Sequence, residues 1–375
     1  MDAGQHAGQQ VTSNADLLSA IAFNCNLVDL ARAAAVSKAW LAAVRTQTNS
    51  LRALHWVRAI SGRNPELAQT GFYFHRHIVE LPDGVLCVPD VNNRGLRLLS
   101  NAGAPLQLLQ AMNVWEYGLQ PRGPACDGTH VYMVDLAGKG CAKSLRPAIE
   151  ASSSHTVFQL SSCWVGDDAL LTPDACAVDG STLYISDSGR DRVIVLDAGS
   201  FQRRGVLGGE SGDGDGRFNR PQGLAARSGL LAVADAGNCR VQLFDGPAPS
   251  FLRSIGRSGD APGCFTEPRG VGLVGARSGG LLLLVAESRR LQLLTLHGEP
   301  LQVLAPGPTP LRLGPPGLWG VALGSSDTRA YVVNTISNEL HLLALNVPHL
   351  PPHHCAVDWN QTRTAARLLA VRPGS

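Results

Sequence analysis

The segment that decides the fold is GESGDGDGRFNRPQG at residues 209–223, which returns as GRSGDAPGCFTEPRG at residues 256–270. Both copies read G-x2-G-x3-G-x-F-x2-P-x-G, with every shared residue displaced by 47 positions. A fixed displacement of this size indicates a repeat architecture, in which one structural unit recurs along the chain. The remaining copies decide how many times the unit recurs.

A second motif, D-x-G-x-x-R-V, opens a tight turn between two apolar runs at residues 185–197 and again at residues 233–245. Weaker copies follow the apolar runs near residues 88, 133, 285 and 332. The residues that open these turns are Asp90, Asp135, Asp187, Asp235, Glu287 and Asn334, spaced 45 to 52 positions apart. The sequence therefore contains six repeats of about 48 residues.

One repeat predicts four short strands, at residues 221–226, 230–235, 240–245 and 250–256. We expect the acidic residue at the turn to accept backbone hydrogen bonds two or three residues on, and the glycine of DSG or DAG to take a positive φ. Four-stranded sheets bury both faces when they pack around a central axis. The predicted fold class is mainly β, a six-bladed β-propeller.

These residues resemble the NHL repeat, a family whose unit runs P-x-G-[V/L]-A, then A-D-x-G-N-x-R-V, then a glycine-rich linker with Phe and Pro. The third and fourth repeats match closely, and the others are degenerate. The resemblance covers residues 70–346 and implies a six-bladed propeller. Either residues 72–75 or the tail that follows Val347 is expected to close the ring.

The first part of the chain has a different composition. The chain holds 41 Gly and 23 Pro, yet residues 9–61 contain neither, which favours helices. Apolar spacing predicts a helical domain at residues 14–61, whose last helix starts at Asn49 or Ser50 and carries Leu51, Leu54, Val57 and Ile60. We expect residues 1–13 to be disordered, residues 62–69 to form a linker, and residues 347–375 to form a tail that closes the propeller or packs on it.

The helical region resembles an F-box, which reads L-x-x-[I/V] and later D-L-x5-V-[S/C]-[K/R]-x-W. Here Leu18, Ile21, Asp29, Leu30, Val36, Ser37, Lys38 and Trp40 occupy those places. The usual Leu-Pro at the start is missing. The resemblance implies docking on a Skp-type adaptor of a cullin–RING ubiquitin ligase, with the propeller holding a protein substrate. The implied adaptor contacts are Leu17, Leu18, Ile21, Leu30, Val36 and Trp40.

Other functions rest on weaker signals. An arginine face at Arg190, Arg192, Arg240, Arg289 and Arg290 would suit RNA, so the alternative is a propeller scaffold that binds RNA or protein without a ubiquitin role. The turn carboxylates fit turn chemistry better than a metal site. Six-bladed lyases and lactonases carry ligands on their inner strands, but the inner strands here are mostly small and apolar. We expect a non-enzymatic protein without metal or cofactor.

Composition sets broad limits. The formal net charge is +2, and no region carries the basic excess of a typical nucleic-acid binder. The nine cysteines include no CxxC pair, which favours reduced thiols over a disulfide framework. No basic-then-apolar leader and no apolar run near the ~20 residues of a membrane helix are visible. An intracellular protein, cytoplasmic and/or nuclear, is expected.

Overall fold

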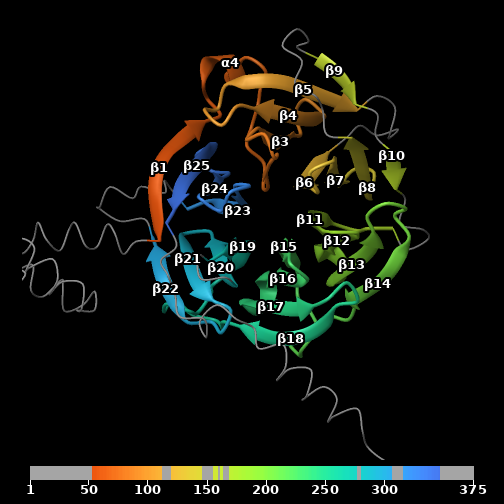
Figure 1. The fold of residues 1–375 in the computed structure, drawn as a ribbon, viewed down its shortest axis with the longest axis vertical. Helices are drawn as coiled ribbons and strands as arrows, with labels where there is room; N and C mark the ends of the chain where they lie inside the picture. The colour runs from red at the N-terminus through yellow and green to blue at the C-terminus, as the bar shows by residue number, and fades with distance from the viewer. Residues whose placement is uncertain are drawn as a thin grey trace, which may run out of the picture. The chain divides into compact units, whose positions relative to one another are not determined.

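The computed structural model describes residues 53–111, 120–145, 155–158, 161–163, 169–276, 280–305 and 316–346. The chain divides into two compact units, and the sheets belong to the unit that contains residues 55–345. Six β-sheets are arranged in a ring, with β6, β11, β15, β19 and β23 nearest the centre (Figure 1). The predicted six-bladed β-propeller is therefore confirmed.

Blades 3, 4 and 5 are antiparallel four-stranded sheets in simple sequence order. The expected strands of the fourth repeat coincide with those of blade 4 to within a residue. From the axis outward, blade 3 consists of β11 (Pro173–Asp179), β12 (Thr182–Asp187), β13 (Arg192–Asp197) and β14 (Arg203–Gly208). Blade 4 consists of β15 (Pro221–Arg227), β16 (Leu230–Asp235), β17 (Arg240–Asp245) and β18 (Ser250–Ile255). Blade 5 consists of β19 (Pro268–Gly275), β20 (Leu281–Glu287), β21 (Arg290–Thr295) and β22 (Pro300–Leu304).

Blades 1, 2 and 6 depart from this simple order. In blade 1 an additional strand, β9, pairs in parallel with β5, and in blade 6 the outermost strand comes from the N-terminal side of the propeller. Blade 1 consists of β2 (Val79–Glu80), β3 (Leu86–Asp90), β4 (Gly95–Leu99), β5 (Pro105–Ala111) and β9 (His155–Phe158). Blade 2 consists of β6 (Pro121–Cys126), β7 (His130–Asp135), β8 (Gly140–Leu145) and β10 (Ser161–Cys163). Blade 6 consists of β23 (Leu318–Leu323), β24 (Arg329–Asn334), β25 (Glu339–Leu345) and β1 (Leu54–Ser61).

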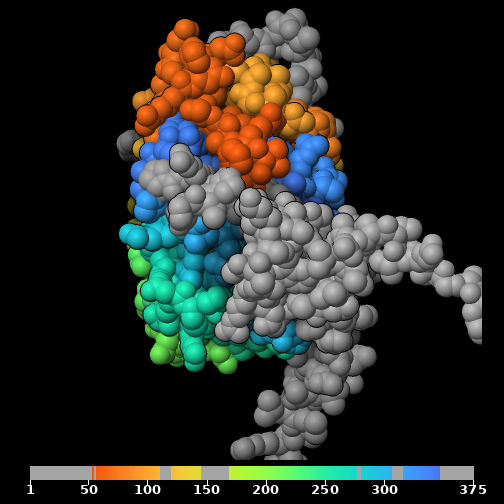
Figure 2. All heavy atoms as spheres, turned by 90° about the vertical axis from the view of Figure 1, so that its left-hand side faces the viewer, coloured from red at the N-terminus to blue at the C-terminus, as the bar shows by residue number. Residues whose placement is uncertain are grey.

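Strand β1 closes the ring, because it pairs with β25 as the fourth strand of blade 6. Figure 2 shows its orange residues beside the blue residues of the last strands. The helix expected to start at Asn49 or Ser50 is therefore wrong over residues 54–61. Burial alternates along β1, with Leu54 and Ile60 buried and Val57 48% exposed, which is the two-residue period of a strand.

Of the two segments expected to close the ring, the described residues include only residues 72–75. Residues 72–75 form no strand, so they do not close the sheet. The tail that follows Val347 lies outside the described residues. The expected linker at residues 62–69 contains a short helix, α4 (Pro65–Ala68), capped by Asn64, whose Oδ1 accepts a hydrogen bond from the Glu66 backbone N–H. Leu67 of this helix is fully buried, so the segment packs on the propeller.

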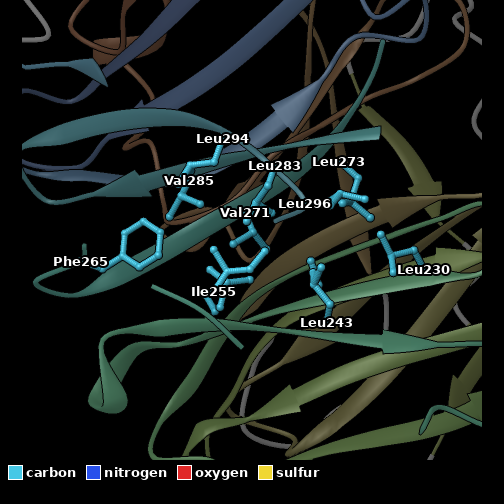
Figure 3. Packing of buried hydrophobic residues seen from close by; sticks show 13 residues of the cluster. Leu230, Leu243, Ile255, Phe265, Val271, Leu273, Leu283, Val285, Leu294 and Leu296 are labelled. Carbon is cyan, nitrogen blue, oxygen red and sulfur yellow. The ribbon is translucent and has the colours of Figure 1, made fainter. Parts of the chain in front are cut away.

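The core consists of apolar layers between neighbouring blades. Between blades 4 and 5, Leu243 and Ile255 meet Val271, Leu283 and other apolar side chains (Figure 3). Phe265 from the G-x-F motif also belongs to this cluster, and Phe218 occupies the same place between blades 3 and 4. The repeated Phe thus secures each glycine-rich linker to the blade interface, where burial of such a ring stabilises by about 2–3 kcal/mol.

The turns between the second and third strands differ from expectation in one detail. The positive φ falls on Asp191 and Cys239, the residues before the third strand, and not on the glycine of DSG or DAG. These glycines are needed for space: a Cβ on Gly237 would lie 2.4 Å from the Asn219 side chain, and one on Gly189 would lie 2.7 Å from Thr172 Oγ1.

Candidate functional site

One residue at or just before the start of each inner strand takes an equivalent position around the axis, and it is the middle residue of the P-x-G motif where that motif is present. The glycine after this residue lets the inner strands come close together, because a Cβ on Gly223, Gly270 or Gly320 would lie 2.1–2.4 Å from a backbone oxygen of the next blade. The close approach aligns equivalent positions around the axis. We call these six residues the axial ring; they are Arg76, Arg122, Asp174, Gln222, Arg269 and Trp319, one from each blade.

Two carboxylates near the axial ring are each shared by two arginines. Asp174, which is fully buried, accepts Arg76 Nη1 at 2.7 Å and Arg122 Nη1 at 3.4 Å on the same oxygen, Oδ1. Glu267 accepts Arg269 at 2.7 Å and lies 3.7 Å from Arg220. The group of Arg76, Arg122 and Asp174 therefore carries one net positive charge, whereas Arg220 also lies beside Asp191, whose Oδ1 accepts its backbone N–H at 2.6 Å.

Trp319 links the arginines across the ring. The guanidinium carbons of Arg76 and Arg269 each lie 4.2 Å from the centroid of its ring, a cation–π arrangement. Because Asp174 and Trp319 come from blades 3 and 6, on opposite sides of the axis (Figure 1), the Arg76 side chain that contacts both of them spans this end of the axis.

Two histidines flank Arg76 on the chain. Burial, followed by the charges of Arg122 and Arg76, lowers the pKa of His75 to about 4. Burial also lowers the pKa of His77 to about 4. Both rings are therefore neutral at pH 7, and the positive charge of the axial ring comes from its arginines.

Several buried polar atoms of the axial ring have no hydrogen-bond partner among the described residues. They are Asp174 Oδ2, Gln222 Oε1 and Trp319 Nε1, with His75 Nδ1 and His77 Nε2 beside them. Buried polar groups are normally satisfied. Several unsatisfied donors and acceptors gathered at one end of the axis, together with partly exposed arginines, mark this end as a candidate binding site.

The predicted turn residues take two forms. Asp90 and Asn334 accept hydrogen bonds from backbone amides of their own turns, and Asp135 accepts both the amide of Gly138 in its turn and that of Gln120, just before the inner strand. Asp235 and Glu287 instead accept the amides of Asn219 and Thr266, which lie just before the inner strand, and Asp187 likewise accepts those of Leu171 and Thr172. In this second form the carboxylate ties the turn to the start of the inner strand.

Three of the five arginines predicted for a ligand face are engaged by these acids. Arg192 pairs with Asp187, Arg240 with Asp235 and Arg290 with Glu287, at N–O distances of 2.6–3.1 Å. Arg240 also donates to the backbone oxygens of residues 213, 214 and 217. Arg290 likewise donates to the backbone oxygens of residues 259, 260 and 264, so Arg240 and Arg290 hold the glycine-rich linkers in place. Arg190 and Arg289 are exposed on turns of blades 3 and 5.

The opposite end of the axis holds a cavity of about 290 Å³ lined mainly by small apolar side chains of the inner strands. Arg227 and Asp327 line part of its wall and form a bidentate ion pair, with both N–O distances at 2.6 Å. Within the described ranges no three His, Cys, Asp or Glu side chains are grouped as a metal site, and no helix is long and apolar enough to span a membrane. The predicted adaptor contacts, Leu17 to Trp40, lie outside those ranges.

Comparisons with known proteins agree with this architecture. The NHL repeat family model matches residues 218–244, which run from the linker Phe through the third strand of blade 4. No curated relative matches the sequence.

Solved structures share the fold at low sequence identity. A gluconolactonase from Xanthomonas campestris is 13% identical with a TM-score of 0.50, over 74% of this chain and 89% of that one. A Bacteroides thetaiotaomicron protein of unknown function is 14% identical with a TM-score of 0.52, over 73% and 70%. A virginiamycin B lyase from Staphylococcus aureus is 9% identical with a TM-score of 0.48, over 72% and 80%. The described chain is thus an NHL-like six-bladed β-propeller with an NHL repeat at residues 218–244.

Proposed function

We propose that the chain is the substrate receptor of a cullin–RING ubiquitin ligase. In this role the F-box-like segment binds a Skp-type adaptor, and the propeller binds a protein substrate at the axial ring. The chain itself catalyses no reaction; the lyase and lactonase activities belong to distant structural neighbours that share only the fold.

The position of the first strand supports a separate adaptor segment. The F-box-like pattern runs from Leu17 to Trp40, whereas the first propeller strand begins at Leu54. The motif and the propeller therefore do not compete for the same residues. The Leu54–Trp56 segment at the end of the F-box resemblance belongs to the propeller, so the adaptor contacts are limited to the residues before it.

The receptor role is supported by one observation: the Pro and Gly at the start of the inner strands repeat, whereas the side chain at the axial position is not the same in every blade. The frame residues repeat, with Pro121, Pro221 and Pro268 opening three of the inner strands. The residue at the axial position is not fixed: three blades contribute an arginine, and the other three contribute Asp174, Gln222 and Trp319. A repeated scaffold that presents different side chains at one position suits recognition of a specific ligand.

Co-expression with a Skp-type adaptor tests the proposal. The full chain is expected to co-purify with the adaptor, and the variants Ile21→Asp and Trp40→Ala are expected to lose it. Arg122→Gln, which alters only the propeller, serves as the matched control and should retain the adaptor. Failure of the full chain to bind any Skp-type adaptor would refute the ligase role.

RNA binding by the propeller remains the second candidate. Of the five arginines proposed for it, Arg190 and Arg289 are the exposed pair, whereas the other three form ion pairs with the turn acids. The probe experiment described below includes an RNA arm that decides between the two ligands.

A further inference from the structure

We infer that the axial ring binds a side-chain carboxylate of a protein ligand, with Arg122, Arg269 and Arg76 as the recognition residues. The inference rests on the proposed receptor function and states which chemical group of the protein ligand the site recognises.

The first argument is charge balance. Arg76 and Arg122 share a single oxygen of Asp174, and Arg269 and Arg220 share Glu267. The Arg76–Arg122 pair keeps one positive charge that Asp174 does not balance, whereas Asp191, which accepts the Arg220 backbone N–H, adds a second carboxylate to the other group. Like charges held close together in a partly buried site repel each other, and the pKa of Arg122 is lowered by burial and by Arg76. A carboxylate bound at this point would relieve the repulsion.

The second argument is accessibility. The side chains of Arg76, Arg122 and Arg269 are 27%, 12% and 18% exposed, so each is largely enclosed by protein but still partly open to solvent. Hydrogen bonds from guanidinium to carboxylate are strong, and partial burial strengthens them. Each guanidinium also has more N–H donors than the single carboxylate contact uses.

The third argument is shape. The inner strands approach so closely at the glycines that a Cβ on Gly320 would lie 2.1 Å from the Arg76 backbone oxygen, so the axial-ring side chains gather in a small area at the start of the inner strands. Trp319 covers part of it with an apolar surface against which Arg76 and Arg269 stack. A single acidic side chain with its methylene stem fits such a site. A polyanion such as RNA requires a longer track of exposed cations.

The test uses the full chain and a fluorescent hexaglutamate peptide with an amidated C-terminus, so that only side-chain carboxylates are offered. Hexaglutamine and hexauridine serve as the neutral and RNA probes. We expect hexaglutamate to bind, hexaglutamine not to bind, and Arg122→Gln to weaken binding about tenfold, as expected for loss of one charge-assisted contact. The control Arg289→Gln removes an exposed arginine outside the ring and should leave affinity unchanged.

A second readout does not depend on the variants. The indole N–H resonance of Trp319, assigned with Trp319→Phe, should shift when hexaglutamate is added to the unmodified chain. Equal affinity of Arg122→Gln and the unmodified chain, or an unshifted Trp319 resonance, would overturn the inference. Binding of hexauridine in place of hexaglutamate would overturn it as well. None of these results would affect adaptor co-purification, so the inference and the ligase role fail separately.

Discussion

Replacing Asp235 with alanine should destabilise the propeller strongly, because this one carboxylate holds several parts of blade 4. It is fully buried, it pairs with Arg240 Nε at 2.8 Å, and it accepts the Asn219 amide at 2.8 Å. The variant would leave the Arg240 charge, whose side chain is 11% exposed, without its counter-ion. The linker that Arg240 holds would then lose its attachment.

The size of the effect follows from burial. Removing one partner of a buried ion pair costs about 3–5 kcal/mol, because the remaining charge is uncompensated. The lost amide contact adds to this, but the two terms belong to one network and do not simply sum. We expect a loss of about 4 kcal/mol in the free energy of unfolding, which lowers the melting temperature by about 10 °C in a domain of this size.

Calorimetry or urea unfolding of the full chain measures the loss. Asp215→Ala changes an exposed acid in the same linker and should alter stability by less than about 0.5 kcal/mol. The double variant Asp235→Ala with Arg240→Met removes both charges and should recover part of the loss. An Asp235→Ala melting temperature equal to that of Asp215→Ala would refute the role assigned to this carboxylate.

Two further predictions concern the axial ring. Gly320→Ala would place a Cβ 2.1 Å from a backbone oxygen of blade 1 and should cost about 3 kcal/mol by overpacking, whereas Gly205→Ala, with open space around it, should be neutral by the same thermal melts. Burial lowers the pKa of His77 to about 4 from 6.5, so between these pH values the unfolded chain binds more protons. The free energy of unfolding should therefore fall as pH drops from 6.5 to 4, by up to about 3 kcal/mol, and urea melts of the full chain should show a smaller fall for His77→Gln.

Periodicity in the sequence predicts the blades well because each repeat carries its own turn and linker signals. The close match between expected and observed strands in blade 4 reflects the complete set of Pro, Asp, Arg and Phe positions there. Strand β1 was missed because Leu54, Val57 and Ile60 also fit helical spacing. The absence of Gly and Pro up to residue 61 favours the same helical interpretation. Pairing with β25, a contact between distant parts of the chain, decides the outcome.

The axial ring was harder to find from the sequence. Arg122, Gln222 and Arg269 stand in a visible P-x-G frame, and a long polar side chain at the same place in each frame was an available signal. Arg76 and Trp319 lack that frame, since they occur in HRH and LWG. Only the close approach of the inner strands places them beside the other axial-ring residues. The shared carboxylate of Asp174 depends on blades far apart in sequence, which no local pattern reveals.

The central claim is that a propeller beginning at Leu54 is joined to a separate adaptor-binding segment. The most direct test is calorimetric titration of a Skp-type adaptor into the full chain and into a chain trimmed to residues 50–375, which keeps all of β1. We predict that the trimmed chain melts like the full chain and does not bind the adaptor, while the full chain binds it in a one-to-one complex. Equal adaptor binding by both chains, or none by the full chain, would contradict the claim.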